Sequence, residues 1–298
     1  RIKQISYDLK YNVNEVVEKK NAALKKEVDV LANLQKLSAS FSTKFLENLV
    51  SKLRVYDSYD QNGKLVEMVQ RGNILNDYVV PEIALEKADI LVGYGVHDDI
   101  SFEEEFSNIY NKPSYGFDCG TEFIDINNKQ TKFIKECIGT AEFLYNRSLK
   151  DNANTVVKSF EQQMKDYEFE KKKLFIKIDI EGAEYEVMPD ILRYAQNITG
   201  IAIEVHFSES HEQVKQVYDL LDDLKKDFVL VHVNGNNCAS NIFTASNCEG
   251  NIPRVIELSY INKNLISDYR LAENQEHPSE LDTADCVGDR LRFKIIAE

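Results

Sequence analysis

The sequence predicts an α/β fold, in which a doubly wound, mainly parallel sheet carries a helical appendage at its N-terminal end. Apolar, strand-like runs alternate with helical segments between residues 89 and 260. One of these runs, Lys-Leu-Phe-Ile-Lys-Ile at residues 173–178, ends abruptly in Asp179 and a Glu-Gly turn. Strands buried on both faces have this composition, and strands that alternate with helices form parallel βαβ units. No proline or glycine interrupts residues 1–62, as expected for helices.

The N-terminal segment is expected to be helical. Residues 12–55 place apolar side chains at helical spacing, as Leu24 and Val28 illustrate. The apolar seam is short and interrupted, which favours an amphipathic helix or helical hairpin over a long coiled coil. We therefore divide the chain into an N-terminal helical appendage, residues 1–80, and a second domain, residues 81–298. This interpretation allows the chain to form a homodimer through these helices.

The remaining elements are expected in a regular order. Strands are expected at residues 89–95, 114–118, 132–139, 173–178, 200–206, 228–234 and 254–260, and residues 291–296 can add a last one. Helices are expected at residues 101–109, 155–170, 183–194 and 211–226. Thr155 is expected to cap the second of these helices. The tail after Asn264 is polar and is expected to be loose.

Charge and composition exclude several classes of partner. The net charge is −14, so the average field repels a phosphate backbone and argues against nucleic acid. The apolar runs are shorter than a bilayer span, and no membrane span is expected. The five cysteines are odd in number and lack Cys-x-x-Cys spacing. We therefore expect neither a disulfide framework nor a zinc site, and a reducing, cytoplasmic location. The chain begins at Arg1 rather than Met, so a preceding segment stays an open alternative.

Glycine and acidic residues end three of the expected strands. The turn Gly93-Tyr94-Gly95 lets the backbone approach a ligand closely, and the helix that follows can offer N–H groups. Asp118 ends the second strand, where an acid can bind the two hydroxyls of a ribose. Asp179 ends the fourth strand, and its alternative role is to cap the next helix. Together these positions favour a ligand that contains adenosine.

The charge near the glycine turn distinguishes between adenosine ligands. The third glycine of the dinucleotide fingerprint is absent, and Asp98 and Asp99 would face a pyrophosphate. Acids suit a ligand without phosphates and with a cationic part, such as S-adenosylmethionine with its sulfonium and ammonium groups. This favours a methyltransferase over an NAD(P)-dependent oxidoreductase. The third expected strand ends at Ile138 and Gly139, which we assign to the same cofactor site.

The sequence also resembles a known family. Residues 177–187, Lys-Ile-Asp-Ile-Glu-Gly-Ala-Glu-Tyr-Glu-Val, are similar to the central signature of the FkbM-type S-adenosylmethionine-dependent methyltransferases. Residues 93–103, 115–118 and 203–206 agree with that family in order and spacing. The resemblance covers about residues 90–260 and leaves out the N-terminal helices.

The resemblance implies a seven-stranded methyltransferase sheet with an antiparallel last hairpin. It also implies O-methylation of a hydroxyl, since members often act on sugars of surface polysaccharides or on natural products. The acceptor would be a small molecule or glycan, such as a nucleotide-linked or capsular sugar. Many relatives carry Gly-Ala-Asn in the first motif, whereas this chain has Gly93-Tyr94-Gly95. This departure resembles a branch found beside polysaccharide genes.

Methyl transfer to a sugar hydroxyl is an in-line displacement that also needs a proton acceptor. His206 ends the fifth strand beside Asp179, and strand alternation places it on one face with Glu204. We expect His206 to be catalytic with Asp179, although a structural role is the alternative. His232 ends the sixth strand and is the second catalytic candidate. We expect Glu181 and Glu204 to bind the acceptor. Asn234 and Asn237 are expected to bind it as well, unless these two only form a turn.

Two further questions are left with alternatives. Asp179, Glu204 and His206 could bind a divalent metal, but magnesium prefers oxygen ligands, so no metal is expected. Without a metal, Asp179 would orient His206 or contact the methionine part of the cofactor. The competing functions are an NAD(P)-dependent oxidoreductase and a non-catalytic partner subunit that binds through its N-terminal helices. The acids at positions 118 and 179 weigh against the partner subunit.

Overall fold

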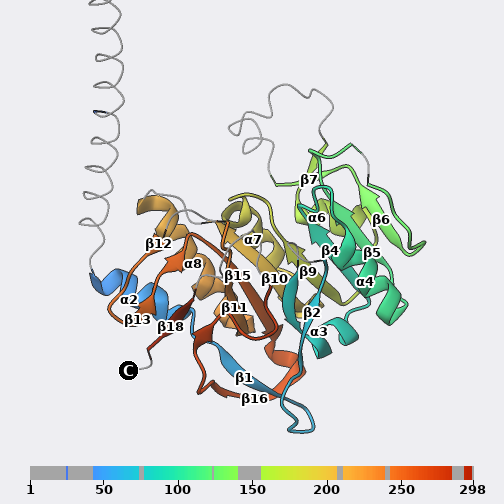
Figure 1. Ribbon diagram of the computed structural model, residues 1–298. Helices are drawn as coiled ribbons and strands as arrows, with labels where there is room; N and C mark the ends of the chain where they lie inside the picture. The colour runs from blue at the N-terminus through green and yellow to red at the C-terminus, as the bar shows by residue number, and fades with distance from the viewer. Residues whose placement is uncertain are drawn as a thin grey trace, which may run out of the picture.

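The computed structural model describes most of the chain from residue 43 onward (Figure 1). The described residues are 25, 43–73, 77–122, 124–139, 156–206, 211–238, 242–283 and 292–296. Most of the predicted helical segment at residues 12–55 lies outside this part, as does the proposed dimer contact through it. Within the described part, α2 (Thr43–Lys52) agrees with the prediction.

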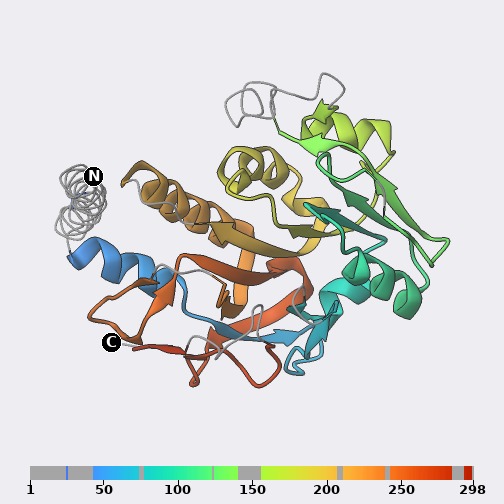
Figure 2. The same ribbon diagram turned by 45° about the horizontal axis from the view of Figure 1, so that its top comes forward.

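A seven-stranded sheet lies at the centre of the molecule (Figures 1 and 2), in the order β11-β15-β10-β9-β4-β5-β6. Its strands are β4 (Ile90–Tyr94), β5 (Ser114–Phe117), β6 (Thr131–Ile134), β9 (Leu174–Ile178), β10 (Ile198–His206), β11 (Phe228–Gly235) and β15 (Val255–Asn262). The strands from β10 to β6 are mutually parallel, whereas β15 runs antiparallel to both β10 and β11. The predicted mainly parallel sheet with an antiparallel last hairpin is therefore confirmed.

Helices cover both faces of the sheet (Figure 2), as the doubly wound prediction requires. The covering helices are α3 (Glu82–Lys87), α4 (Ser101–Tyr110), α6 (Phe160–Asp166), α7 (Glu184–Leu192) and α8 (His211–Asp227). On one face, Ile176 packs in a cluster with Met188 of α7. On the other face, Phe175 packs in a cluster with Phe106 of α4. Burial of each such side chain contributes about 1.5–3 kcal/mol, so these contacts hold β9 rigidly between two layers.

The segment before β4 packs on the same body. Strand β1 (Tyr56–Asp60) pairs with β16 (Ile266–Leu271), and β2 (Met68–Arg71) pairs with β3 (Tyr78–Pro81). Helix α2 buries Leu49 in the cluster that includes the central strands. These contacts tie the described part of residues 1–80 to the sheet. The division at residue 80 stays a prediction about the whole chain.

Two local predictions are wrong around the third strand. The expected strand at residues 132–139 is interrupted, because β6 ends in the central sheet and β7 (Cys137–Ile138) pairs separately with β8 (Val157–Lys158). The expected helix at residues 155–170 therefore begins later, at α6. Its cap is Ser159, whose Oγ accepts a hydrogen bond from the backbone N–H of Gln162 at 3.2 Å.

The tail after Asn264 is not loose in its described part. Besides β16, it forms β17 (Glu276–His277) and β18 (Phe293–Ile295), and β18 also pairs with β13 (Cys248–Gly250). A further pair joins β12 (Ile242–Phe243) to β14 (Ile252–Pro253). Only the first residue of β16 is buried. Main-chain pairing holds this ribbon, so its side chains carry little apolar signal in the sequence.

The cysteine prediction is also wrong. Cys119 and Cys137 form a disulfide, with their Cα atoms 4.9 Å apart. Cys238 is disulfide-bonded as well, while Cys248 is free. Sequence spacing could not reveal the first pair, because the fold brings together two residues 18 positions apart. These disulfides remove the ground on which a reducing compartment was expected.

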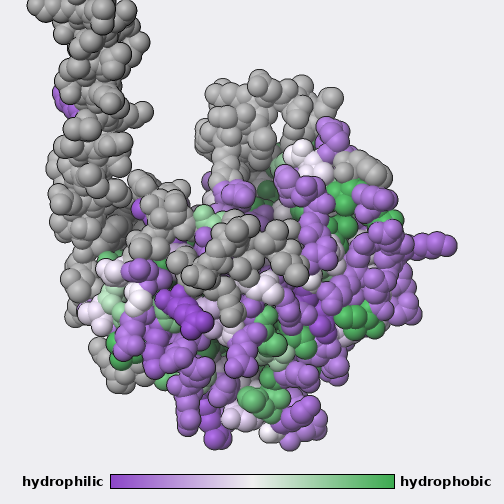
Figure 3. Space-filling model, viewed as in Figure 1, coloured by the Kyte–Doolittle hydropathy of each residue, from purple (hydrophilic) through white to green (hydrophobic). Residues whose placement is uncertain are grey.

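The surface agrees with the acidic composition. Figure 3 shows a largely hydrophilic face, on which hydrophobic residues form small separate patches. Among the helices that the structure describes, none is both long and apolar enough to cross a membrane.

We predict that the stability of the fold is sensitive to acid because of a buried histidine in β17. Burial and the nearby His232 lower the pKa of His277 to about 4, and Asp282 only partly opposes them. An unfolded histidine titrates at about 6.5, so between these values the unfolded chain binds a proton that the folded chain does not. We expect the free energy of unfolding to fall by about 3 kcal/mol from pH 7 to pH 4 through this residue. Urea unfolding at a series of pH values measures this slope.

The control separates His277 from the other acid-sensitive groups. His277→Gln should flatten the slope by that amount, whatever its stability at neutral pH. His97→Gln removes an imidazole that is 81% exposed and whose pKa is raised by Asp98, so it should not flatten the slope. Equal slopes in wild type and His277→Gln would contradict the assignment.

Candidate active site

The carboxyl ends of three neighbouring strands build the site. Tyr94 of β4 pairs with Ile178 of β9, and Ile178 pairs with Ile203 of β10. The ladder continues one step past β9, where the backbone N–H of Asp179 donates to the carbonyl of Tyr94 at 3.0 Å. This register places the residues that follow each strand at one edge of the sheet, as expected for a ligand site in an α/β fold.

A pocket of about 230 Å³ opens at this edge. Four acids line it, namely Asp118, Glu136, Asp179 and Glu181, together with apolar side chains such as Ile138. No lysine or arginine is among its described lining residues. Such a pocket suits a ligand with a cationic group and an apolar or aromatic part. S-adenosylmethionine fits these acids because it carries cationic groups, whereas they would repel a pyrophosphate.

The two glycines near the carboxyl end of β4, Gly93 and Gly95, have different structural roles. Gly95 has φ +75°, and a Cβ there would lie 1.5 Å from the carbonyl oxygen of Asp179. Only glycine lets β4 and the segment after β9 approach this closely. A Cβ on Gly93 would instead lie 1.9 Å from Oε1 of Glu103, a fully buried residue whose pKa is raised by burial. Gly93 thus makes room for a buried side chain of α4 and does not line the pocket.

The residues predicted to bind the cofactor divide into those that line the pocket and those that do not. Tyr94, Gly95, Asp118, Ile138 and Asp179 line the pocket. The others do not line it: Gly93, Asp98, Asp99 and Gly139.

Asp118 is held in place by the loops around it. Its Oδ2 accepts a hydrogen bond from the backbone N–H of His97 at 3.0 Å. Its Oδ1 accepts from the N–H groups of Gly120 and Thr121, at 2.7 and 3.0 Å. By contrast, Asp99 accepts from the backbone N–H of Ser101 and so supports the start of α4.

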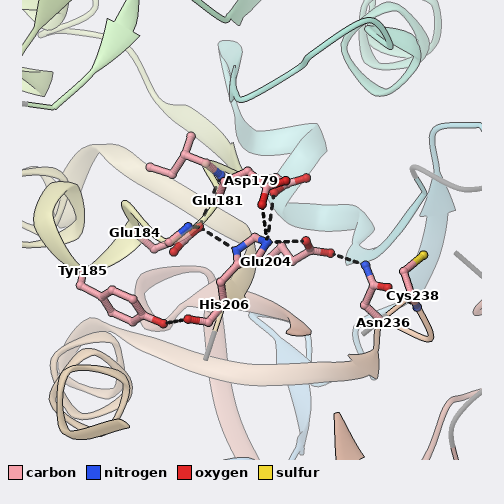
Figure 4. A network of polar contacts seen from close by, with 10 residues as sticks. Asp179, Glu181, Glu184, Tyr185, Glu204, His206, Asn236 and Cys238 are labelled. Carbon is pink, nitrogen blue, oxygen red and sulfur yellow. Dashed lines mark hydrogen bonds and ion pairs between the residues drawn. The ribbon is translucent and has the colours of Figure 1, made fainter. Parts of the chain in front are cut away.

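Next to the pocket, the imidazole of His206 is surrounded by carboxylates (Figure 4). Its Nδ1 lies 3.0 Å from Oε1 of Glu184. Its Nε2 lies 3.1 Å from Glu204 Oε1, 3.4 Å from Glu181 Oε2 and 4.0 Å from Asp179 Oδ1. Asp179 and Glu181 belong both to this cluster and to the pocket. The prediction that Asp179, Glu204 and His206 lie together agrees with this geometry.

The turn after β9 is shaped by its own side chains. Glu181 and Gly182 both have positive φ, at 55° and 90°. Glu184 is fully buried, and its Oε1 also accepts a hydrogen bond from the backbone N–H of Gly182 at 2.9 Å. An acid in the first turn of a helix is favoured by the helix dipole. Glu184 therefore stabilises the turn, the start of α7 and the orientation of His206 together.

The charges in the cluster are strongly coupled. Burial alone would lower the pKa of His206, but Glu184 and Glu204 raise it to about 11. Without a bound cation, the imidazole therefore keeps its proton at neutral pH and cannot accept another. Burial, followed by the charge of Glu204, raises the pKa of Asp179 above its usual range. The Oδ1 atom of Asp179 is buried and makes no hydrogen bond with any residue that the structure describes.

The predicted residues of the sixth strand lie apart from the cluster. His232 is buried inside β11, and its Nε2 lies 2.7 Å from Asp282. Asn234 is also buried, and its Nδ2 donates to Glu257 at 2.9 Å. Asn237 lies in the turn that follows. Strand β15 lies between β10 and β11, so the strands of His206 and His232 are two strand spacings apart, about 10 Å. The two histidines are also offset along the sheet, because His206 pairs with Val255 and His232 with Ser259.

Sequence reasoning missed two members of the cluster. Glu184 lies within the signature segment, but its contact with His206 depends on the turn. Asn236 donates from Nδ2 to Oε2 of Glu204 at 2.9 Å. Its position in the run Asn-Gly-Asn-Asn was a usable signal, although Asn234 and Asn237 were chosen instead. Cys119 and Cys137, which also line the pocket, carried no such signal.

A pair of glycine substitutions tests the close approach at Gly95. Gly63 has nearly the same φ, +74°, but a Cβ there meets nothing within 4 Å. Gly95→Ala and Gly63→Ala thus carry the same backbone penalty, and only the first adds a clash with a main-chain oxygen. We expect Gly95→Ala to lower the free energy of unfolding by about 2 kcal/mol more than Gly63→Ala. Equal losses in urea unfolding would show that the backbone at Gly95 relaxes freely.

The chain is similar to one family model and to several solved structures. The family described as methyltransferase FkbM domain matches residues 14–230. No curated protein matches the chain. Similar solved structures include the fibrillarin/Nop5p complex, with 10% identity over 59% of this chain and 73% of that one, at a TM-score of 0.30.

Two further structures are methyltransferases with a bound ligand. Streptococcus pneumoniae Sp1610, named as a candidate tRNA (m1A22) methyltransferase in complex with S-adenosyl-L-methionine, is 10% identical over 64% of this chain and 74% of its own, at a TM-score of 0.31. The plantazolicin methyltransferase BamL, in complex with a desmethyl plantazolicin analogue and S-adenosylhomocysteine, is 9% identical over 61% and 82%, at 0.27. The FkbM match covers more than half of the chain, and the chain therefore belongs to the FkbM family of S-adenosylmethionine-dependent methyltransferases.

Proposed function

We propose that this methyltransferase acts on a hydroxyl group of a sugar, either nucleotide-linked or part of a surface or capsular polysaccharide. The observation that carries the proposal is the cluster around His206, which shares Asp179 and Glu181 with the cofactor pocket. Carboxylates can accept hydrogen bonds from sugar hydroxyls and can take up a proton. The acceptor would thus lie next to the reacting end of the cofactor.

The residues of the chain have separable tasks in this reaction. Bound S-adenosylmethionine would supply a methyl group, which would pass in line from the sulfonium sulfur to the acceptor oxygen and leave S-adenosylhomocysteine. Asp118 and the backbone at Gly95 hold the adenosine end, and the acidic wall favours the cationic end. Glu181 and Glu204 orient the acceptor hydroxyl, and a carboxylate of the cluster takes its proton. His206 assists by holding Glu184 and Glu204 in place.

The pocket acid Asp118 gives a test of cofactor binding. We expect Asp118→Asn to weaken S-adenosylhomocysteine binding about tenfold or more, since each good charged hydrogen bond is worth about 1.5–3 kcal/mol. Asp125→Asn is the matched control, because Asp125 is an exposed acid in the loop that follows and does not line the pocket. Calorimetric titration measures both affinities. NAD should not stabilise the wild type in thermal melting, and stabilisation by NAD alone would overturn the proposed cofactor site.

The acceptor class is tested by methyl transfer to a panel. Radiolabelled S-adenosylmethionine is offered with nucleotide sugars, capsular oligosaccharides, and amine and thiol compounds of similar size. We expect the label in a base-stable methyl ether of a sugar, because the site offers oxygen acceptors and a place for the proton. Labelling only of amines or thiols would contradict the sugar hydroxyl as acceptor.

A further inference from the structure

The ligand atoms around His206 have the spacing of a metal coordination shell. Asp179, Glu181 and His206 each place one potential ligand atom within 4.8 Å of the others. Glu204 adds a fourth, 3.1 Å from Nε2 of His206. With bonds of about 2.1–2.2 Å, neighbouring ligands of an octahedron lie about 3 Å apart and opposite ligands about 4.3 Å apart. The distances from Nε2 to the three carboxylates, 3.1, 3.4 and 4.0 Å, lie in this range.

The residues that contact the potential ligands His206 and Glu204 are also arranged as in a metal site. A metal-binding histidine usually donates its other ring N–H to a carboxylate, and Nδ1 of His206 faces Glu184 in this way. Metal-binding carboxylates are in turn hydrogen-bonded, and the second oxygen of Glu204 accepts from Asn236. Glu184 and Glu204 are both more than nine-tenths buried, so this arrangement is built into the fold.

The described residues do not provide a hydrogen-bond or ion-pair partner for every carboxylate oxygen of the cluster. A single Nε2 proton can serve only one of three carboxylates, and the buried Oδ1 of Asp179 makes no hydrogen bond with the described residues. In that same part of the chain, no lysine or arginine forms an ion pair with Asp179, Glu181, Glu184 or Glu204. Buried charges without partners are costly, and a bound cation removes that cost.

We infer that His206 Nε2 and the carboxylates of Asp179, Glu181 and Glu204 bind one divalent metal ion beside the cofactor pocket. The sequence alone favoured no metal, because one histidine and two acids suit magnesium poorly. Glu181 raises the number of carboxylate ligands to three, which suits manganese or magnesium, and the imidazole favours manganese of the two. Its role rests on the proposed function: beside the acceptor, the ion would bind the sugar hydroxyl and lower the pKa of that hydroxyl.

Manganese binding to the full chain tests the site directly. Protein freed of metal with a chelator is titrated with Mn²⁺ without cofactor, and free Mn²⁺ is followed by electron paramagnetic resonance. We expect one site, weakened at least tenfold in Glu181→Gln. Glu181 has a side chain that is 80% exposed, so its replacement spares folding. Glu276→Gln, which removes an exposed glutamate paired with Lys294, is the matched control and should bind as wild type.

The outcomes separate this inference from the proposed function. Absence of Mn²⁺ binding, or binding that Glu181→Gln and the isosteric Glu204→Gln leave unchanged, would overturn the metal site. Binding of S-adenosylhomocysteine is measured on the same samples without metal. If it binds while Mn²⁺ does not, the metal inference fails and cofactor use stands. Displacement of Mn²⁺ by millimolar Mg²⁺ would support the oxygen-rich shell, whereas displacement by Zn²⁺ alone would contradict it.

Discussion

The fixed register of β9 between β4 and β10 is the constraint on which the site depends. All five residues of β9 are buried, and its two faces belong to different apolar clusters. A slip of one residue would exchange these faces, placing Lys177 among apolar side chains and moving Asp179 away from His206. Hydrophobic burial in the middle of the sheet therefore determines the positions of polar groups at its edge. The absence of a side chain at Gly95 completes this constraint, because it permits contact with the backbone of Asp179.

The acidic edge is unfavourable for folding and is best explained by ligands. Four carboxylates surround one imidazole, and two of those carboxylates also line the pocket. Burial, followed by repulsion from Glu204, raises the pKa of Asp179, whereas attraction by Glu184 and Glu204 outweighs burial and raises the pKa of His206. A cationic cofactor on one side, and a metal ion on the other, would each lower this electrostatic cost. Strain of this kind is commonly retained at functional sites, since a more stable arrangement would bind less well.

Local patterns predicted the parts of the fold that apolar runs determine. The strands ending at Asp118, Asp179 and His206 were located from composition and alternation alone, and their shared edge followed from parallel pairing. Contacts between distant segments were not predictable in this way. The disulfide between Cys119 and Cys137, the bond from Asn236 to Glu204 and the ribbon of β1 with β16 each join residues whose sequence neighbours carry no sign of the partner.

The same limit explains why both His206 and His232 were catalytic candidates in the sequence. His206 and His232 both appear near the end of a strand in the sequence, and nothing local distinguishes them. Strand β15 lies between their strands, so only His206 borders Asp179. The sequence also could not show how many acids would face the ring. That number decides its chemistry, because an imidazole among four carboxylates keeps its proton unless a metal ion replaces it.

Helix α7 connects these features into one unit. Glu184 binds the ring of His206 and the turn at Gly182, while the hydroxyl of the next residue, Tyr185, donates to the carbonyl of His206. Both ends of the histidine are thus held by the first two residues of the helix. Asp179 and Glu181 lie on the segment between β9 and that helix. Any movement of α7 would therefore shift the carboxylates at the pocket and the imidazole together, which couples the pocket to the cluster around His206.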